Sequence, residues 1–162
     1  MGKLVVDRTE LAELVRKHQA AGQRVVMTNG GFDLLHVGHI RYLRGAAAEG
    51  DVVIVAINSD RSVRQNKGPD RPLMPLHERM EIISAIEGVT YVTSFDEPTC
   101  DGLLECLRPD VHAKGPDYTP ENLPERNTLK RLGIRLAIVG DPKDHASSAL
   151  LKKMRQSARQ AG

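Results

Sequence analysis

Apolar residues recur along the chain in two alternating patterns: short continuous runs and positions spaced for a helix. Runs rich in Val, Ile and Ala predict buried strands at 24–28, 52–57, 89–93, 111–114 and 134–139. Helical spacing between them predicts helices at 8–21, 37–49, 76–87, 99–107, 122–132 and 146–159. Strands that alternate with helices indicate βαβ units, and therefore an α/β fold with a doubly wound parallel sheet.

The organisation of the chain predicts one domain over residues 1–162, with its core at about 24–155, because no repeat or linker divides it. Two stretches rich in Gly, Pro and Asp, 66–75 and 115–124, predict long loops. Ligands of open parallel sheets bind where the strands end. The polar segments that follow predicted strands are therefore expected to converge on one edge of the sheet; they are 29–39, 58–60, 114–118 and 140–148.

Composition narrows the class of protein. The chain is 40% hydrophobic and 27% charged, as soluble globular domains are, and only 3% aromatic, so its core must be aliphatic. A net charge of +2, from 23 basic and 21 acidic residues, argues against a nucleic-acid surface. Neither a signal core at 1–10 nor a membrane-length apolar run is present, and Cys100 and Cys106 have no metal or redox spacing. We therefore expect a cytoplasmic protein without membrane or nucleic-acid partners.

The strongest chemical signal is the sequence NGGFDLLHVGH at 29–39. A strand ends at Thr28, two glycines permit a tight turn, and a helix begins near Val37. A helix N-terminus attracts phosphate through its unpaired N–H groups and its dipole, and imidazoles there can donate further hydrogen bonds. Two alternatives are a pair of histidines that cap a surface helix, and a metal site. No Cys or further His nearby completes a metal site, so we predict none.

This run, GGFDLLHVGH, resembles the HxGH signature of the cytidylyltransferase-like nucleotidyltransferases. Further short runs follow in the order of that family: NSD at 58–60, KG at 67–68, RP at 71–72, ERM at 78–80, SFDE at 94–97, RPD at 108–110 and KGPDY at 114–118. The set is most similar to the D-glycero-β-D-manno-heptose 1-phosphate adenylyltransferases of ADP-heptose synthesis, over roughly residues 8–155. Some members carry this module behind a sugar kinase, and the chain resembles the stand-alone form.

The resemblance implies a nucleotidyltransferase fold of Rossmann-like type, ATP as donor, Mg²⁺, a sugar 1-phosphate as acceptor, a lipopolysaccharide precursor as product, and a homodimer. It implies catalytic roles for His36, His39, Lys67 and Arg79. The nucleotide-binding residues are then expected to be Gly30, Gly31, Phe32, Gly38, Lys114, Gly115, Ser147 and Ser148. The acceptor is expected to contact Asn29, Asp33, Asn58, Asp60, Asp117 and Tyr118.

Several of these residues also have plainer interpretations. Lys67 lies in a predicted flexible loop, and loop chemistry alone favours an ordinary solvated lysine; only the resemblance favours the catalytic role. Arg79 could instead be a residue on the helix surface that pairs with Glu78 or Asp70. Asp33 could instead cap the helix that starts nearby.

The C-terminal segment departs from the family pattern. Ser147, Ser148 and Ala149 stand where relatives carry Ser-Thr-Thr or similar, and His145 stands where they often have Gly. Gly31 is smaller than the residue usually found between Gly and Phe.

Two other functions remain open at this stage. One keeps the chemistry and changes the substrate: glycerol 3-phosphate or phosphocholine with CTP, or flavin mononucleotide with ATP. The other is a nucleotide-binding module that has lost turnover, and its only support is Ala149 and His145.

Overall fold

The computed structural model describes residues 1–141 and 147–161, and the strands of this part form one sheet in the order β1-β4-β3-β2-β5-β6. The strands are β1 (Lys3–Leu4), β2 (Val25–Gly30), β3 (Val52–Asn58), β4 (Tyr91–Phe95), β5 (Val111–Lys114) and β6 (Arg135–Ile138). Every neighbouring pair is parallel, which confirms the predicted parallel sheet. The chain proceeds outward from β2 to β4 and then resumes on the other side of β2, so the order reverses between β2 and β5.

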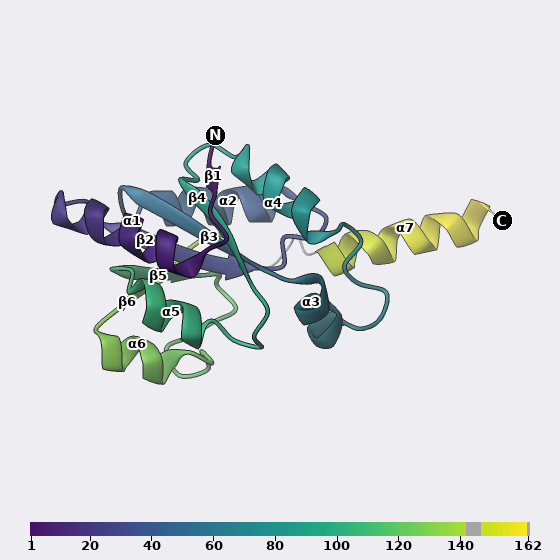
Figure 1. Ribbon diagram of the computed structural model, residues 1–162. Coiled ribbons are helices and arrows are strands. Elements are labelled where there is room, and N and C mark those ends of the chain that lie inside the picture. Colours follow the sequence, from purple (N-terminus) through teal and green to yellow (C-terminus); the bar gives the residue numbers. More distant parts are fainter. Residues whose placement is uncertain (142–146, 162) are drawn as a thin grey trace.

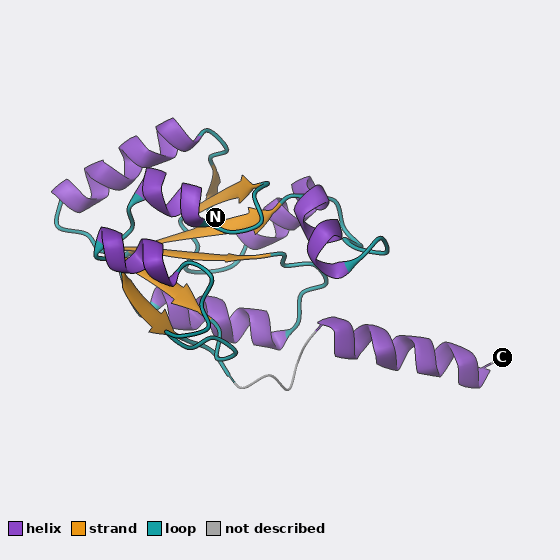
Figure 2. Ribbon diagram, turned by 90° about the horizontal axis from the view of Figure 1, so that it is seen from below, coloured by secondary structure: helices purple, strands orange, loops and turns teal. Residues whose placement is uncertain are grey.

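Helices cover both faces of the sheet (Figures 1 and 2). They are α1 (Arg8–Ala20), α2 (Val37–Ala47), α3 (Asp60–Lys67), α4 (Leu76–Ser84), α5 (Asp101–Leu107), α6 (Arg126–Leu132) and α7 (Ser147–Ala161). Helices α1, α5 and α6 pack with Met27 and Ile54 on one face. Helices α2 and α4 pack with Val55 and Ile57 on the other, so the sheet is wound on both sides. Helix α7 projects away from the sheet on the side where the strands end (Figure 2).

The predicted helices and strands are found with small shifts, and two elements were missed. Strand β1 is a two-residue edge strand, too short for a pattern. Helix α3 has the sequence DRSVRQNK, in which only Ser62 and Val63 are buried, so no apolar row marks it. Lys67 is therefore the last residue of a helix instead of a loop residue. Gly68 ends that helix, with a φ of 102° that glycine adopts without strain.

Two other boundaries moved for local reasons. Strand β4 begins at Tyr91, two residues later than expected, because Val89 belongs to a turn in which its N–H donates a hydrogen bond to the carbonyl oxygen of Ile86. Helix α6 begins at Arg126, because the stretch 119–124 before it forms turns in which Thr119 and Asn122 hydrogen-bond to each other. In the described part of the chain, no helix is both long enough and apolar enough to cross a bilayer.

The core contains a buried histidine that makes stability depend on pH. His112 of β5 is fully buried between Met27 and Leu136 of the neighbouring strands. Burial, and then the charge of Lys114, lower its pKa from 6.5 to about 3. The unfolded chain therefore binds more protons than the folded one between these values. The contribution of neutral His112 to the stability of the fold is fully present above pH 6.5 and is lost as pH falls toward 3.

From this depressed pKa we expect the contribution of His112 to the free energy of unfolding to fall by about 2 kcal/mol between pH 7 and pH 5. Urea titrations of wild type and His112→Leu at both pH values measure this difference. The leucine variant should lose correspondingly less stability on acidification. His77→Gln, at an exposed position, should behave as wild type. Parallel losses in wild type and His112→Leu would contradict the prediction.

Candidate active site

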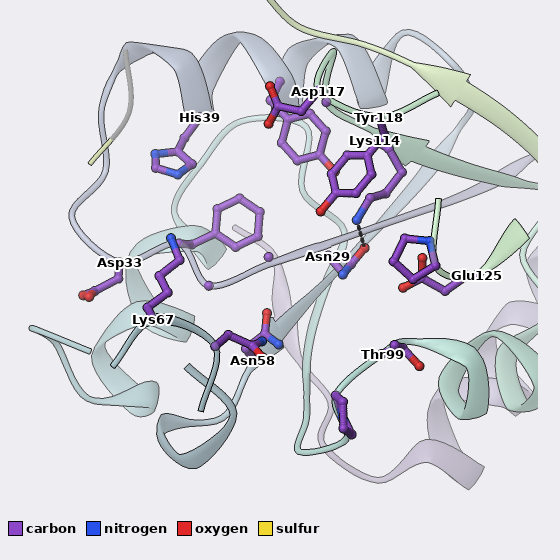
Figure 3. Close-up of a pocket in the computed structure, with 18 residues that line it drawn as sticks. Asn29, Asp33, His39, Asn58, Lys67, Thr99, Lys114, Asp117, Tyr118 and Glu125 are labelled. Atoms are coloured by element: carbon purple, nitrogen blue, oxygen red, sulfur yellow. Dashed lines mark hydrogen bonds between the residues drawn. The ribbon is translucent and has the colours of Figure 1, made fainter. Parts of the chain in front are cut away.

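A cavity of about 500 Å³ opens where β2 and β5 end, beside the point at which the strand order reverses (Figure 3). Most of the residues expected at a nucleotide and acceptor site line it: Asn29, Gly30, Gly31, Phe32, Asp33, His39, Asn58, Lys67, Lys114, Gly115, Asp117 and Tyr118. The expected convergence on one edge of the sheet is therefore confirmed for the segments 29–39, 58–60 and 114–118. Most of the fourth segment, 140–148, lies outside the described residues.

The turn after β2 is shaped by its apolar residues as well as by its glycines. Phe32 and Leu34 have left-handed backbone conformations, with φ of 50° and 59°. A Cβ on Gly30 would lie 3.1 Å from the Phe32 ring, so Gly30 leaves room for that ring. A Cβ on Gly31 would meet only Val63, at an ordinary 3.7 Å. The chain is thus not bent at the two glycines. The left-handed backbone conformations lie after them, at Phe32 and Leu34.

The two histidines are held at the first turn of α2 by backbone hydrogen bonds. His36 is the residue that caps the helix, and its Nδ1 accepts from the N–H of Gly38 at 3.1 Å. Nδ1 of His39 accepts from the N–H of His36 at 3.2 Å, and the two ring centroids are 4.0 Å apart. A ring nitrogen that accepts carries no proton, so these bonds assign the proton of each neutral ring to Nε2. Capping is therefore confirmed for His36, and it leaves Nε2–H as the donor of each ring.

The charge state of His39 is set by its surroundings. Burial lowers its pKa to about 4, and the nearby His36 and Lys67 act in the same direction. Near neutral pH the free protein therefore presents a neutral imidazole, whose Nε2–H is a hydrogen-bond donor. Such a donor can stabilise charge that develops on a phosphate oxygen without giving up a proton.

Asp33 holds a neighbouring segment in place. Its carboxylate accepts from Nε of Arg71 at 2.8 Å and from the N–H groups of Leu73 and Met74 at 2.7 and 3.0 Å. Burial opposes ionisation, but these hydrogen bonds hold the pKa of Asp33 below its ordinary value. The carboxylate thus ties the stretch before α4 to the turn after β2. The helix-cap interpretation of Asp33 is wrong, because His36 caps α2. Its acceptor role stays a prediction, since Asp33 also lines the pocket.

Arg79 is a second residue whose side chain makes contacts that the sequence did not predict. Its side chain is completely buried and lies outside the pocket lining. The guanidinium donates to the carbonyl oxygens of Gly31, Asn58 and Met74 at 2.7–3.0 Å, and to Oδ1 of Asp60 at 2.6 Å. Arg79 and Asp60 therefore join the turn after β2 to the end of β3. The burial of Arg79 contradicts its surface alternative, whereas its catalytic role and the acceptor role of Asp60, whose side chain is 40% exposed, stay predictions.

Two lysines approach the pocket from opposite sides. Lys67 extends from the end of α3 toward His39 (Figure 3). Lys114, buried at the end of β5, donates to Oδ1 of Asn29 at 3.0 Å and lies 4.3 Å from the ring centroid of Tyr118. Burial lowers the pKa of Lys114, and the charge of Glu125 opposes that shift. A lysine thus lies at each end of the pocket, and the one at the end of β5 is close to Glu125.

Comparison with known proteins identifies the chain. The model of the cytidylyltransferase-like family matches residues 27–154. The chain belongs to this family. As a cytidylyltransferase-like protein it is a nucleotidyltransferase, as the resemblance of the 29–39 run implied.

Relatives within the cytidylyltransferase-like family are considerably longer. The bifunctional protein HldE of Alcanivorax borkumensis is 36% identical over 155 residues, which are 96% of this chain and 33% of that protein. Its counterpart in Geobacter metallireducens is 45% identical over 129 residues, 80% of this chain and 26% of that protein. The chain thus spans about a third or less of these relatives.

A solved structure shares the fold of this cytidylyltransferase-like chain. It is the lipopolysaccharide core biosynthesis protein from Thermoplasma volcanium, with a TM-score of 0.65 and 24% identity over 75% of this chain and all of that one. The expected nucleotidyltransferase fold of Rossmann-like type is therefore confirmed.

The pocket of this cytidylyltransferase-like chain also contains residues that the sequence did not single out: Tyr42, Asn66, Pro98, Thr99, Pro124 and Glu125. Pro98, Thr99 and Glu125 belong to the turns that lead into α5 and α6, so a search beyond the ends of the strands is needed to find them. Helix α7 begins at Ser147, as expected for a helix near 146. The side chains of Ser147 and Ser148, and the whole of His145, lie outside the described residues.

Proposed function

We propose that the chain transfers AMP from ATP to D-glycero-D-manno-heptose 1-phosphate and releases pyrophosphate and ADP-heptose. The observation that carries this proposal is the imidazole of His39 beside Lys67 in the lining of a pocket that is large enough for a ligand, with the ring of His36 packed next to that of His39. The names of the HldE relatives and the run of motifs shared with heptose 1-phosphate adenylyltransferases support the choice of acceptor.

The chemistry is an in-line displacement. An oxygen of the acceptor phosphate attacks the α-phosphorus of ATP, a P–O bond forms, and the bond to the β-phosphate breaks. Because the attacking oxygen is already ionised, no general base is needed, and catalysis consists of positioning and charge stabilisation. In this proposal the Nε2–H groups of His36 and His39 and the ammonium of Lys67 stabilise the negative charge that grows on the leaving pyrophosphate.

Magnesium fits this pocket as an ion held mainly by the nucleotide. Magnesium in nucleotide sites is bound through substrate phosphates and water with few protein carboxylates. Over residues 1–141 and 147–161, no three His, Cys, Asp or Glu side chains gather to form a cage made by the protein alone. We infer that phosphate oxygens and water hold the ion, which neutralises charge on the triphosphate, and we assign no residue to it.

The activity is tested by pyrophosphate release from each of ATP, CTP, GTP and UTP paired with several acceptors in the presence of Mg²⁺. The acceptors are heptose 1-phosphate, glycerol 3-phosphate, phosphocholine and flavin mononucleotide. We expect release with ATP and heptose 1-phosphate only. Release with a different pair would move the chain to another substrate within the same family. Binding of ATP with no release from any pair would instead support a module without turnover.

The proposal also covers the oligomeric state of the chain and its place in the cell. We propose a single nucleotidyltransferase domain that acts in the cytoplasm as a homodimer on small-molecule substrates. Sedimentation of the purified chain measures its oligomeric state directly, and a monomer over the concentration range of the assay would contradict the dimer.

A further inference from the structure

Glu125 is a buried carboxylate on the pocket wall without an assigned role. It follows Pro124 and immediately precedes α6, and only 3% of its surface is exposed. Oε1 accepts from the N–H of Cys100 at 3.3 Å, whereas Oε2 is buried and has no hydrogen-bond partner in the described part of the chain. Burying a carboxylate oxygen without a donor is costly, and native structures rarely retain one without a use.

The neighbours of Glu125 do not supply the missing donor. Lys114 is close enough for its pKa to be raised by the charge of Glu125, yet its ammonium is directed to Asn29. Among the described residues, Glu125 and Lys114 form no ion pair within 4.0 Å. The Thr99 hydroxyl is directed to Oδ2 of Asp101 at 2.5 Å. Oε2 of Glu125 is thus an acceptor that a ligand in the pocket would satisfy.

The position of Glu125 indicates which part of a ligand it meets. Figure 3 shows His39 and Lys67 on one side of the pocket and Glu125 on the other, near Lys114. A carboxylate repels phosphate, so the group beside it must not be an anion and must carry O–H or N–H donors. Hydroxyl groups of a sugar meet both conditions.

We propose that Oε2 of Glu125 accepts hydrogen bonds from hydroxyl groups of the acceptor, and so selects a polyhydroxylated phosphate ester over a small or apolar one. This inference rests on the proposed transfer to a sugar phosphate and adds to it the residue that recognises the sugar. Glu125 takes no part in bond making or breaking. Its contribution therefore belongs to the KM of the acceptor.

Glu125→Gln tests this contribution with little change in shape. The amide oxygen can still accept from Cys100, while the group at the position of Oε2 becomes a donor and no longer accepts. We expect the KM for heptose 1-phosphate to rise about 10- to 100-fold, as hydrogen bonds to charged groups predict. The KM for ATP should stay within twofold and the thermal midpoint should not fall. Glu121→Gln, an exposed position in the same segment, is the matched control and should behave as wild type.

Acceptor analogues give a second test that needs no variant. Wild type should lose affinity for a heptose 1-phosphate analogue that lacks one of the contacted ring hydroxyls, and Glu125→Gln should bind that analogue and the parent sugar alike. An unchanged acceptor KM in Glu125→Gln would overturn the inference, as would equal affinity of wild type for all deoxy analogues. A rise in the KM for ATP alone would assign Glu125 to the nucleotide and also overturn it.

The outcomes separate this inference from the proposed function. Turnover of heptose 1-phosphate by wild type with no effect of Glu125→Gln would keep the function and reject the role of Glu125. Turnover of another hydroxyl-rich phosphate, with a raised KM in the variant, would reject heptose and keep the role. An absence of turnover and binding with every hydroxylated acceptor would reject both.

Discussion

Replacing His39 with asparagine is expected to lower kcat by about 10²–10³-fold, because one donor to the transition-state charge is lost. The asparagine oxygen occupies nearly the position of Nδ1, so it can still accept from the N–H of His36 and preserve the start of α2. It places no donor at the position of Nε2. Steady-state rates together with the thermal midpoint measure the two effects separately, and the midpoint should change little.

A glutamine at position 39 tests whether the hydrogen-bond donor is sufficient without the imidazole ring. Its amide nitrogen reaches nearly the position of Nε2, so His39→Gln should be more active than His39→Asn. His77→Asn, at an exposed position of α4, is the control and should match wild type in rate. If His39→Asn keeps more than a third of the wild-type kcat, the imidazole is not a donor to the reacting phosphates.

Replacing Arg79 with methionine is expected to reduce the free energy of unfolding by about 3–5 kcal/mol, because four hydrogen bonds of a completely buried guanidinium are lost, each worth roughly 1 kcal/mol. Methionine fills similar space but leaves Asp60 without its cation and the carbonyl oxygens of Gly31, Asn58 and Met74 without their common donor. Urea unfolding measures the difference. In a chain of this size the thermal midpoint should fall by roughly 10 °C.

The control for Arg79 is an arginine whose ion pair is at the surface. Arg61 pairs with Asp96, and both side chains are at least half exposed, so Arg61→Met should destabilise the protein far less than Arg79→Met does. A stable Arg79→Met protein with a strongly reduced kcat would show that Arg79 acts on substrate after all. A destabilised protein supports the role as a link between the strand ends.

Much of the fold was predictable because buried strands are made of uninterrupted β-branched runs. Strand β3 is almost completely apolar and lies within one residue of its predicted bounds. Helix α3 was not predictable in this way, because a short helix that buries two side chains has no apolar period to detect. The site was predictable as a location, since polar residues at the ends of parallel strands meet there whatever their individual roles.

The roles of single residues were harder to predict, because several act through backbone atoms. The three carbonyl groups that Arg79 binds are present in every residue type, so sequence patterns carry no trace of them. One signal was available. Arg79 lies within the apolar stripe of α4, next to Met80 and one turn before Ile83, and a charged residue in such a stripe indicates a buried pair. Glu125 had no comparable signal.

The cap of α2 has a consequence for how the chain can change over evolution. Serine and aspartate cap helices better than imidazole does, so position 36 is not optimised for the stability of the helix it begins. A better cap would remove an Nε2–H group from the site. Selection for a more robust protein and selection for a faster enzyme therefore act in opposite directions at this residue, and robustness must be gained elsewhere, for example on the exposed surface of α1 or α5.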